Sequence, residues 1–106
     1  MSDSTILQRL SETIAARKHA DPTGSYVAGL FSKGHEAILK KVAEESAETL
    51  LAAKDDDKLH LVRETADLWF HCLVLLAWHG AMVDDVLAEL QRREGVSGLK
   101  EKAARK

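Results

Sequence analysis

Two long helical patterns, separated by only three aspartates, are the feature that most constrains the fold. Apolar side chains recur at helical spacing from about Glu36 to Lys54, and again from about Lys58 to His79. Asp55-Asp56-Asp57 ends the first helix and offers an N-cap and an acidic first turn to the second. The short connection predicts a hairpin of two helices that lie side by side.

Three further helices are predicted around this hairpin. An amphipathic helix precedes a loop at residues 19–24, a helix of at most two turns starts at Ser25, and another helix starts at Val83. Apolar side chains surround most of the helix that begins at Lys58, so we expect that helix to be central and mostly buried. The fold class is therefore a small all-α bundle, and a second copy would help to bury its apolar faces.

Composition predicts one domain and excludes several classes of function. The chain has 106 residues, of which 45% are hydrophobic and 30% charged, so it is not a disordered chain. We expect residues 1–94 to form the domain and residues 95–106 to be its flexible or conditionally ordered basic tail. A net charge of −2 gives no general field for nucleic acid, so an anionic ligand needs a local site.

The expected location is the cytoplasm, with no membrane partner. The N-terminus is polar and lacks the apolar core of a signal peptide, and the longest apolar run, Cys72 to Trp78, is too short to span a bilayer. Cys72 is the single cysteine, which excludes a disulfide within the chain and predicts a buried thiol.

Carboxylates recur three residues apart on both helices of the hairpin. Glu45 and Glu48 share a face of the first helix, and Glu64 and Asp67 share a face of the second, along a stripe that continues into apolar sequence. Carboxylates beside apolar packing need a positive partner. A site whose ligands are all carboxylate oxygens suits Mg²⁺, with Mn²⁺ also possible. Bound Mg²⁺ keeps water ligands that can exchange with phosphate oxygens. The pattern indicates a phosphorylated substrate and metal-activated water.

Other interpretations of these residues remain open at this stage. The glutamates could be solvated helix positions paired with Lys40, Lys41 or Arg63. A di-iron centre normally uses Glu-x-x-His, which is absent here. His71 follows Asp67 by one turn and is more simply a hydrogen-bonded core histidine than a partner of the metal site.

The residues around the acids resemble a known family. Glu44-Glu45-x-x-Glu48 with Glu64-x-x-Asp67 is similar to the MazG-like all-α nucleotide pyrophosphohydrolases. Over about residues 5–106 the chain resembles the phosphoribosyl-ATP pyrophosphohydrolase family of histidine biosynthesis. The flanking segments that carry this resemblance are Ser25-Tyr26-Val27-Ala28, Lys33-Gly34, Ile38-Leu39-Lys40-Lys41-Val42-Ala43, Ala66-Asp67-Leu68 and Asp84-Asp85-Val86-Leu87.

The resemblance implies a magnesium-dependent helical homodimer, in which the second subunit helps to form the substrate pocket. Its expected reaction converts 1-(5-phosphoribosyl)-ATP to 1-(5-phosphoribosyl)-AMP and pyrophosphate. By motif position the principal metal ligands are Glu45, Glu48, Glu64 and Asp67, and Glu44 would bind a second metal or orient the attacking water. The implied phosphate neighbours are Lys33, Lys40, Lys41 and Lys54, of which Lys41 shares the stripe of Glu45 and Glu48.

The chain departs from the family pattern at two positions. Ala43 stands where the family often has glycine, and Met82 stands where it has a hydroxyl residue, but neither is a proposed ligand. Nothing in the chain resembles the cyclohydrolase domain that some members carry, so we expect a stand-alone enzyme.

Two alternative functions remain for the chain. They are a house-cleaning pyrophosphohydrolase of nucleoside triphosphates and a non-catalytic helical dimerisation module.

Overall fold

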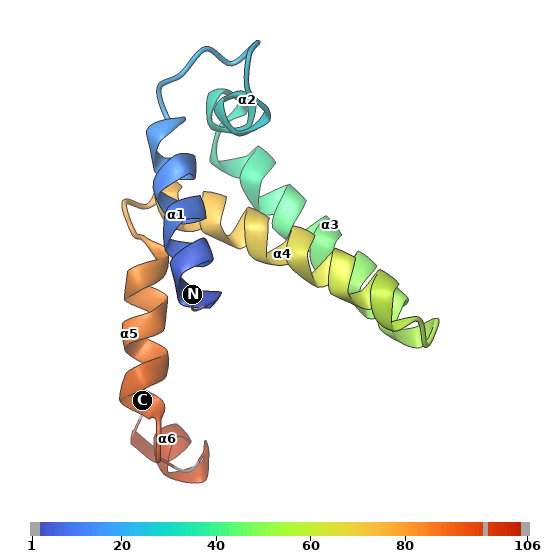
Figure 1. Ribbon diagram of the computed structural model, residues 1–106, viewed down its shortest axis with the longest axis vertical. Helices are drawn as coiled ribbons and strands as arrows, with labels where there is room; N and C mark the ends of the chain where they lie inside the picture. Colours follow the sequence, from blue (N-terminus) through green and yellow to red (C-terminus); the bar gives the residue numbers. More distant parts are fainter. Residues whose placement is uncertain (1–2, 97, 105–106) are drawn as a thin grey trace.

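The computed structural model describes residues 3–96 and 98–104, and within them it contains helices and no strand (Figure 1). The helices are α1 (Asp3–Ala16), α2 (Tyr26–Lys33), α3 (His35–Lys54), α4 (Lys58–Trp78), α5 (Val83–Arg93) and α6 (Gly98–Ala104). The predicted all-α class is thus confirmed. Helix α6 lies in the expected basic tail, of which residues 97, 105 and 106 lie outside the described residues.

The predicted hairpin is formed by α3 and α4, which pack along each other (Figure 1). The side chain of Asp57 accepts a hydrogen bond from the backbone N–H of His60 at 3.2 Å, so it is the N-cap of α4. Asp56 has a φ of 57°, a left-handed conformation that aspartate tolerates better than most residues. The three aspartates therefore end α3, make the turn and start α4.

The other helix ends also follow from local sequence. Ser25 caps α2 by accepting from the N–H of Ala28 at 3.2 Å, and Gly34, with a φ of 103°, separates α2 from α3. Met82 is a poor cap for α5, and two neighbours compensate. Asp85 accepts from the N–H of Met82 at 2.9 Å, and the Ser11 hydroxyl of α1 accepts from the N–H of Val83 at 3.0 Å.

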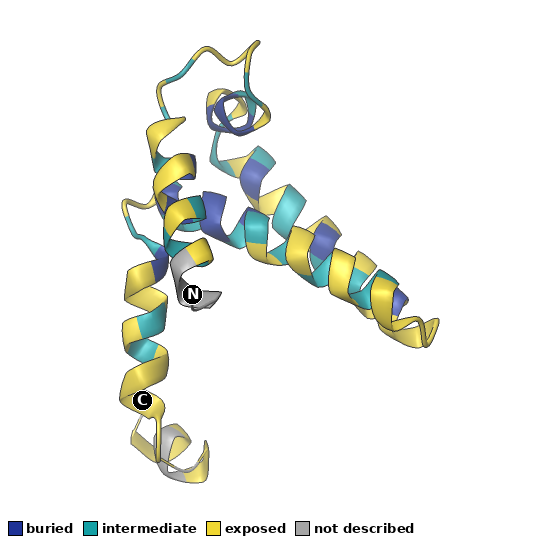
Figure 2. Ribbon diagram, in the orientation of Figure 1, coloured by how far each residue is buried: buried dark blue, intermediate teal, exposed yellow. Residues whose placement is uncertain are grey.

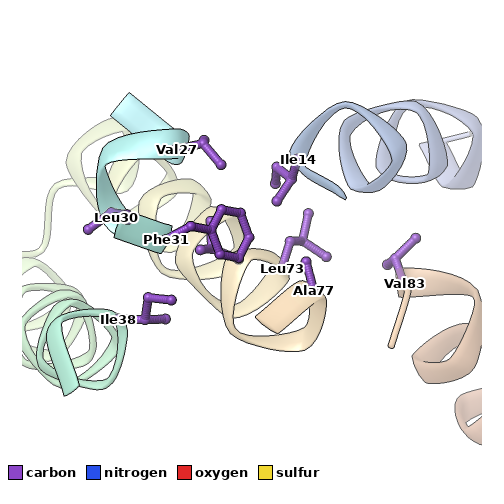
Figure 3. Packing of buried hydrophobic residues seen from close by; sticks show 9 residues of the cluster. Ile14, Val27, Leu30, Phe31, Ile38, Leu73, Ala77 and Val83 are labelled. Carbon is purple, nitrogen blue, oxygen red and sulfur yellow. The ribbon is translucent and has the colours of Figure 1, made fainter. Parts of the chain in front are cut away.

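The core lies where the first five helices meet (Figure 3). Figure 1 shows the α3–α4 hairpin projecting to one side of this junction while α1 and α5 run in another direction. The buried cluster is Ile14, Val27, Leu30, Phe31, Ile38, Leu73, Val74, Ala77 and Val83. Because α4 contributes only residues near its C-terminal end, the core anchors one end of the hairpin and leaves the other end outside it.

The prediction that α4 is mostly buried is wrong in the single chain for the part of this helix from Lys58 to Trp69. Val62 is 63% exposed and Trp69 is 56% exposed, and Figure 2 shows the outer half of the hairpin largely in the exposed and intermediate classes. The reason is geometric: this half lies beyond the junction of the helices and packs chiefly against α3. Cys72 is likewise only partly buried, and this burial raises the pKa of its thiol.

The chain is more open than a compact monomer of its mass. Its accessible surface is 7613 Å², whereas a compact monomeric domain of this mass exposes about 5,900 Å². Its radius of gyration is 15.7 Å, against about 13 Å for a compact domain of this length. Both the α3–α4 hairpin and α5 extend away from the junction of the helices (Figure 1).

Within the described residues, no single helix combines the length and the apolar character needed to cross a membrane. The bent pair of α4 and α5, at 107° to each other, meets those criteria only when both helices are taken together.

Candidate functional site

Three of the predicted carboxylates meet on the projecting hairpin. Glu45, Glu48 and Glu64 each offer one oxygen atom that lies within 4.8 Å of the other two. The first two share a face of α3 because they are three residues apart, and Glu64 faces them from α4. The hydroxyl of Thr49 donates to the carbonyl oxygens of Glu45 at 2.8 Å and Glu64 at 3.2 Å, which holds the two helices in register here.

Glu45 is the most buried member of this carboxylate cluster. It is 7% exposed, and its Oε2 atom is buried without a hydrogen-bond partner. A buried carboxylate oxygen without a partner costs free energy, and neighbouring carboxylates increase this cost by repulsion. A hard divalent cation would remove both penalties, so the donor chemistry and the burial fit such an ion.

Lys41 lies at the edge of the carboxylate cluster, as its place on the helical stripe predicted. Its Nζ atom is 3.6 Å from Glu44 Oε1 and 3.7 Å from Glu45 Oε1. Partial desolvation lowers the pKa of Lys41, but Tyr26, Glu45 and Glu44 act in the opposite direction and raise it overall. The ammonium group is therefore charged beside the cluster and faces partly into solvent.

The remaining predicted site residues are more dispersed. Asp67 is exposed and is not part of the three-carboxylate cluster, although its stripe does continue into the buried residues His71 and Val74. Glu44 is exposed and paired with Lys41. Lys33 lines an open hollow of about 500 Å³ beside the N-terminus of α2, and Lys40 and Lys54 are exposed on α3.

His60 and Thr49 belong to the site although the sequence analysis gave them no role. His60 Nε2 lies 3.3 Å from Glu64 Oε2, and its Nδ1 lies 3.9 Å from Asp55. The spacing of four residues between His60 and Glu64 was a usable signal. Thr49 had no such signal, because its contact with Glu64 depends on how α3 and α4 pack.

His71 confirms the prediction of a hydrogen-bonded core histidine. It is 6% exposed, and its Nδ1 atom lies 2.8 Å from the carbonyl oxygen of Asp67. Its Nε2 atom lies 2.8 Å from the hydroxyl of Tyr26, which starts α2. The two hydrogen bonds of the buried His71 ring thus link Tyr26 of α2 to the turn of α4 that carries Asp67.

Repulsion within the carboxylate cluster gives a pH-dependent expectation for Glu48→Gln. Hydrogen bonding to Glu45 and repulsion from its charge raise the pKa of Glu48 above the ordinary value of 4.5. A raised carboxyl pKa means that the folded state holds the proton more tightly, so ionising Glu48 destabilises the metal-free fold as the pH rises through that pKa. We expect Glu48→Gln to raise the melting temperature in EDTA at neutral pH.

The stabilisation by Glu48→Gln should shrink as the pH falls and Glu48 becomes protonated in the wild type. Thermal unfolding in EDTA over a pH series measures it, with exposed Glu36→Gln on the same helix as the control. An equal gain at acid and neutral pH would show that the effect does not come from ionisation of Glu48.

Comparisons with known proteins agree on one family. The family model described as Phosphoribosyl-ATP pyrophosphohydrolase matches residues 7–94. A curated protein of Nitrosospira multiformis is 69% identical over 106 residues, which are 100% of this chain and 88% of that protein. A protein of Chromobacterium violaceum is 64% identical over 95% of this chain and 94% of its own length. A protein of Neisseria gonorrhoeae is 57% identical over 99% of this chain and 97% of its own length. All three are named phosphoribosyl-ATP pyrophosphatase.

Proposed function

The chain belongs to the phosphoribosyl-ATP pyrophosphohydrolase family, and we propose that its carboxylate cluster is the metal site of that reaction. The enzyme hydrolyses 1-(5-phosphoribosyl)-ATP to 1-(5-phosphoribosyl)-AMP and pyrophosphate, the second step of histidine biosynthesis. The observation that carries the proposal is the buried Oε2 atom of Glu45, which has no partner and lies among converging carboxylates.

Mg²⁺ is the cation that we propose for this site, and Mn²⁺ has the same preference for oxygen ligands. Glu45, Glu48 and Glu64 would hold it, and Asp67, one turn after Glu64 on α4, would complete the set. When bound, the ion neutralises charge on phosphate oxygens and makes a coordinated water more acidic. His60, whose Nε2 atom lies 3.3 Å from Glu64 Oε2, would orient the Glu64 carboxylate.

The residues around the carboxylate cluster supply binding and orientation. Lys41 presents its ammonium group at the edge and would bind the phosphate oxygens, with Lys33, Lys40 and Lys54 adding positive charge further out. Glu44 is exposed next to Lys41, and we assign it the role of orienting the attacking water or holding a second ion. Water forms a new bond to phosphorus while the α–β phosphoanhydride bond breaks, and one proton of the water is released.

We further propose that the active enzyme is a homodimer whose second copy covers the outer half of the hairpin. Apolar side chains lie exposed there, on both helices: Leu50, Leu51, Leu59, Val62 and Trp69. The accessible surface exceeds that of a compact monomer by about 1,700 Å², which is more than one partner's share of a standard interface, about 800 Å². The carboxylate cluster lies on the same hairpin, so the second copy would help to enclose the substrate. We also propose a cytoplasmic location, which suits an enzyme with a nucleotide substrate.

Substrate competition tests the proposed function. Purified protein with Mg²⁺ is expected to release pyrophosphate from phosphoribosyl-ATP at least about a hundredfold more efficiently than from ATP, dATP or dGTP, because only the former carries the second ribose phosphate. Hydrolysis in oxygen-18 water then shows which product takes up the label. Efficient cleavage of common triphosphates with no action on phosphoribosyl-ATP would indicate the house-cleaning activity instead.

A further inference from the structure

Thr49 joins the two helices of the hairpin at the level of the carboxylate cluster. Its hydroxyl donates to the carbonyl oxygen of Glu45, one turn earlier on α3, at 2.8 Å, and to the carbonyl oxygen of Glu64 on α4 at 3.2 Å. The single hydroxyl proton is therefore shared between two acceptors in a three-centre hydrogen bond. Among the described residues of α3 and α4, no other hydrogen bond connects the two helices.

Two nearby hydroxyl groups show what is unusual about Thr49. Ser46 on α3 donates to the carbonyl oxygen of Val42 at 2.8 Å, and Thr65 on α4 donates to that of Leu61 at 2.8 Å. Both bonds stay within one helix, which is the usual arrangement for serine and threonine in helix interiors. Thr49 makes the same local bond and also reaches the facing helix, so its second contact comes from helix packing and not from helix geometry.

The two acceptors of Thr49 belong to residues whose carboxylates meet in the cluster. Glu45 and Glu64 each offer an oxygen atom, and these atoms lie within 4.8 Å of each other. Like charges at this distance repel, and sliding or separating the two helices would relieve the repulsion. The buried core lies toward the other end of the hairpin, so these two turns depend chiefly on contacts between α3 and α4. The shared hydrogen bond opposes the movement that repulsion favours.

We propose that Thr49 is a positioning residue of the metal site: by bonding both carbonyl oxygens, it holds the turns of Glu45 and Glu64 at the separation at which their carboxylates bind one divalent cation. The inference rests on the proposed function, because it takes the carboxylate cluster to be the metal site. It goes further by assigning part of the metal affinity to a hydroxyl group that acts through the backbone of two ligands.

Replacing Thr49 by valine tests this role, because valine keeps the branched shape and removes only the hydroxyl. The carbonyl oxygens of a helix interior also accept from the N–H four residues later, so none is left without a partner. The melting temperature in EDTA should therefore stay within about 3 °C of the wild type. Calorimetry should show about tenfold weaker Mg²⁺ binding, the effect of losing a group that orients metal ligands. Thr49→Ser keeps the hydroxyl and should restore most of the affinity.

The matched controls are Thr65→Val and Ser46→Ala. Each removes a hydroxyl that bonds only within its own helix, next to Glu64 or Glu45 in the sequence, and each should bind Mg²⁺ as the wild type does. Hydrolysis measured against Mg²⁺ concentration gives a second result. Thr49→Val should need about tenfold more Mg²⁺ for half-maximal turnover, with kcat at saturating Mg²⁺ nearly unchanged, because excess cation refills the site.

Several outcomes would overturn the role of Thr49. They are wild-type Mg²⁺ affinity in Thr49→Val, an equal loss of affinity in Thr65→Val, and a low kcat that excess Mg²⁺ does not restore. A valine variant that does not fold would show that Thr49 serves the fold and not the site. If the wild type binds Mg²⁺ but does not hydrolyse phosphoribosyl-ATP, the proposed function fails, and the Mg²⁺ titrations still decide the role of Thr49. A wild type that binds no Mg²⁺ would reject the metal site and this role together.

Discussion

Replacing Glu45 by glutamine is expected to lower kcat at least about a hundredfold while leaving the metal-free protein as stable as the wild type or more so. Glu45 is buried, its Oε2 has no partner, and Glu48 and Glu64 lie beside it. Glutamine has nearly the same shape but no charge, so it binds a divalent cation poorly and removes repulsion from the cluster. One substitution should thus separate function from folding.

Three measurements test the Glu45→Gln prediction. Calorimetry measures Mg²⁺ binding, pyrophosphate release measures turnover, and thermal unfolding in EDTA measures the stability of the metal-free protein. Glu36→Gln is the matched control, because it changes the same chemical group in the exposed first turn of α3. Unchanged Mg²⁺ binding in Glu45→Gln would support the view that these acids are solvated charges of a non-catalytic helical module.

Replacing Val62 by glutamate is expected to convert a dimer to a monomer. Val62 is exposed in the single chain and lines an apolar hollow with Leu61, Ala66 and Trp69, so a second copy seated there would bury its side chain. An unpaired charge buried in an interface costs about 3–5 kcal/mol, and a symmetric dimer carries two of them. The dissociation constant should therefore rise at least about a hundredfold.

Sedimentation equilibrium over a concentration series measures the effect of Val62→Glu. Thr13→Glu introduces the same charge at an exposed position of α1, away from the hairpin, and should sediment as the wild type does. A wild-type protein that sediments as a monomer at all concentrations would contradict the proposed homodimer. A Val62→Glu dimer as stable as the wild type would place the interface elsewhere.

Most of the helical framework could be predicted because its signals are local. The cap at Ser25, the break at Gly34 and the aspartate turn each act within a few residues of the chain. The expected burial of α4 failed in the single chain for a physical reason. Helical periodicity tells which side chains are apolar, but it cannot tell whether this chain or another copy covers them.

Part of the candidate site could likewise be predicted from local sequence, and the rest depends on how the helices pack. The sequence alone determined that Glu45 and Glu48 share a face with Lys41, because a helix repeats every 3.6 residues, and the surrounding motifs identified the family.

Only the tertiary structure decided which carboxylates meet, since the packing of α3 on α4 brings Glu64 to the cluster and leaves Asp67 exposed. It also joined Tyr26 to His71 across 45 residues of chain. Such contacts depend on the rotation and spacing of packed helices, which no local pattern contains.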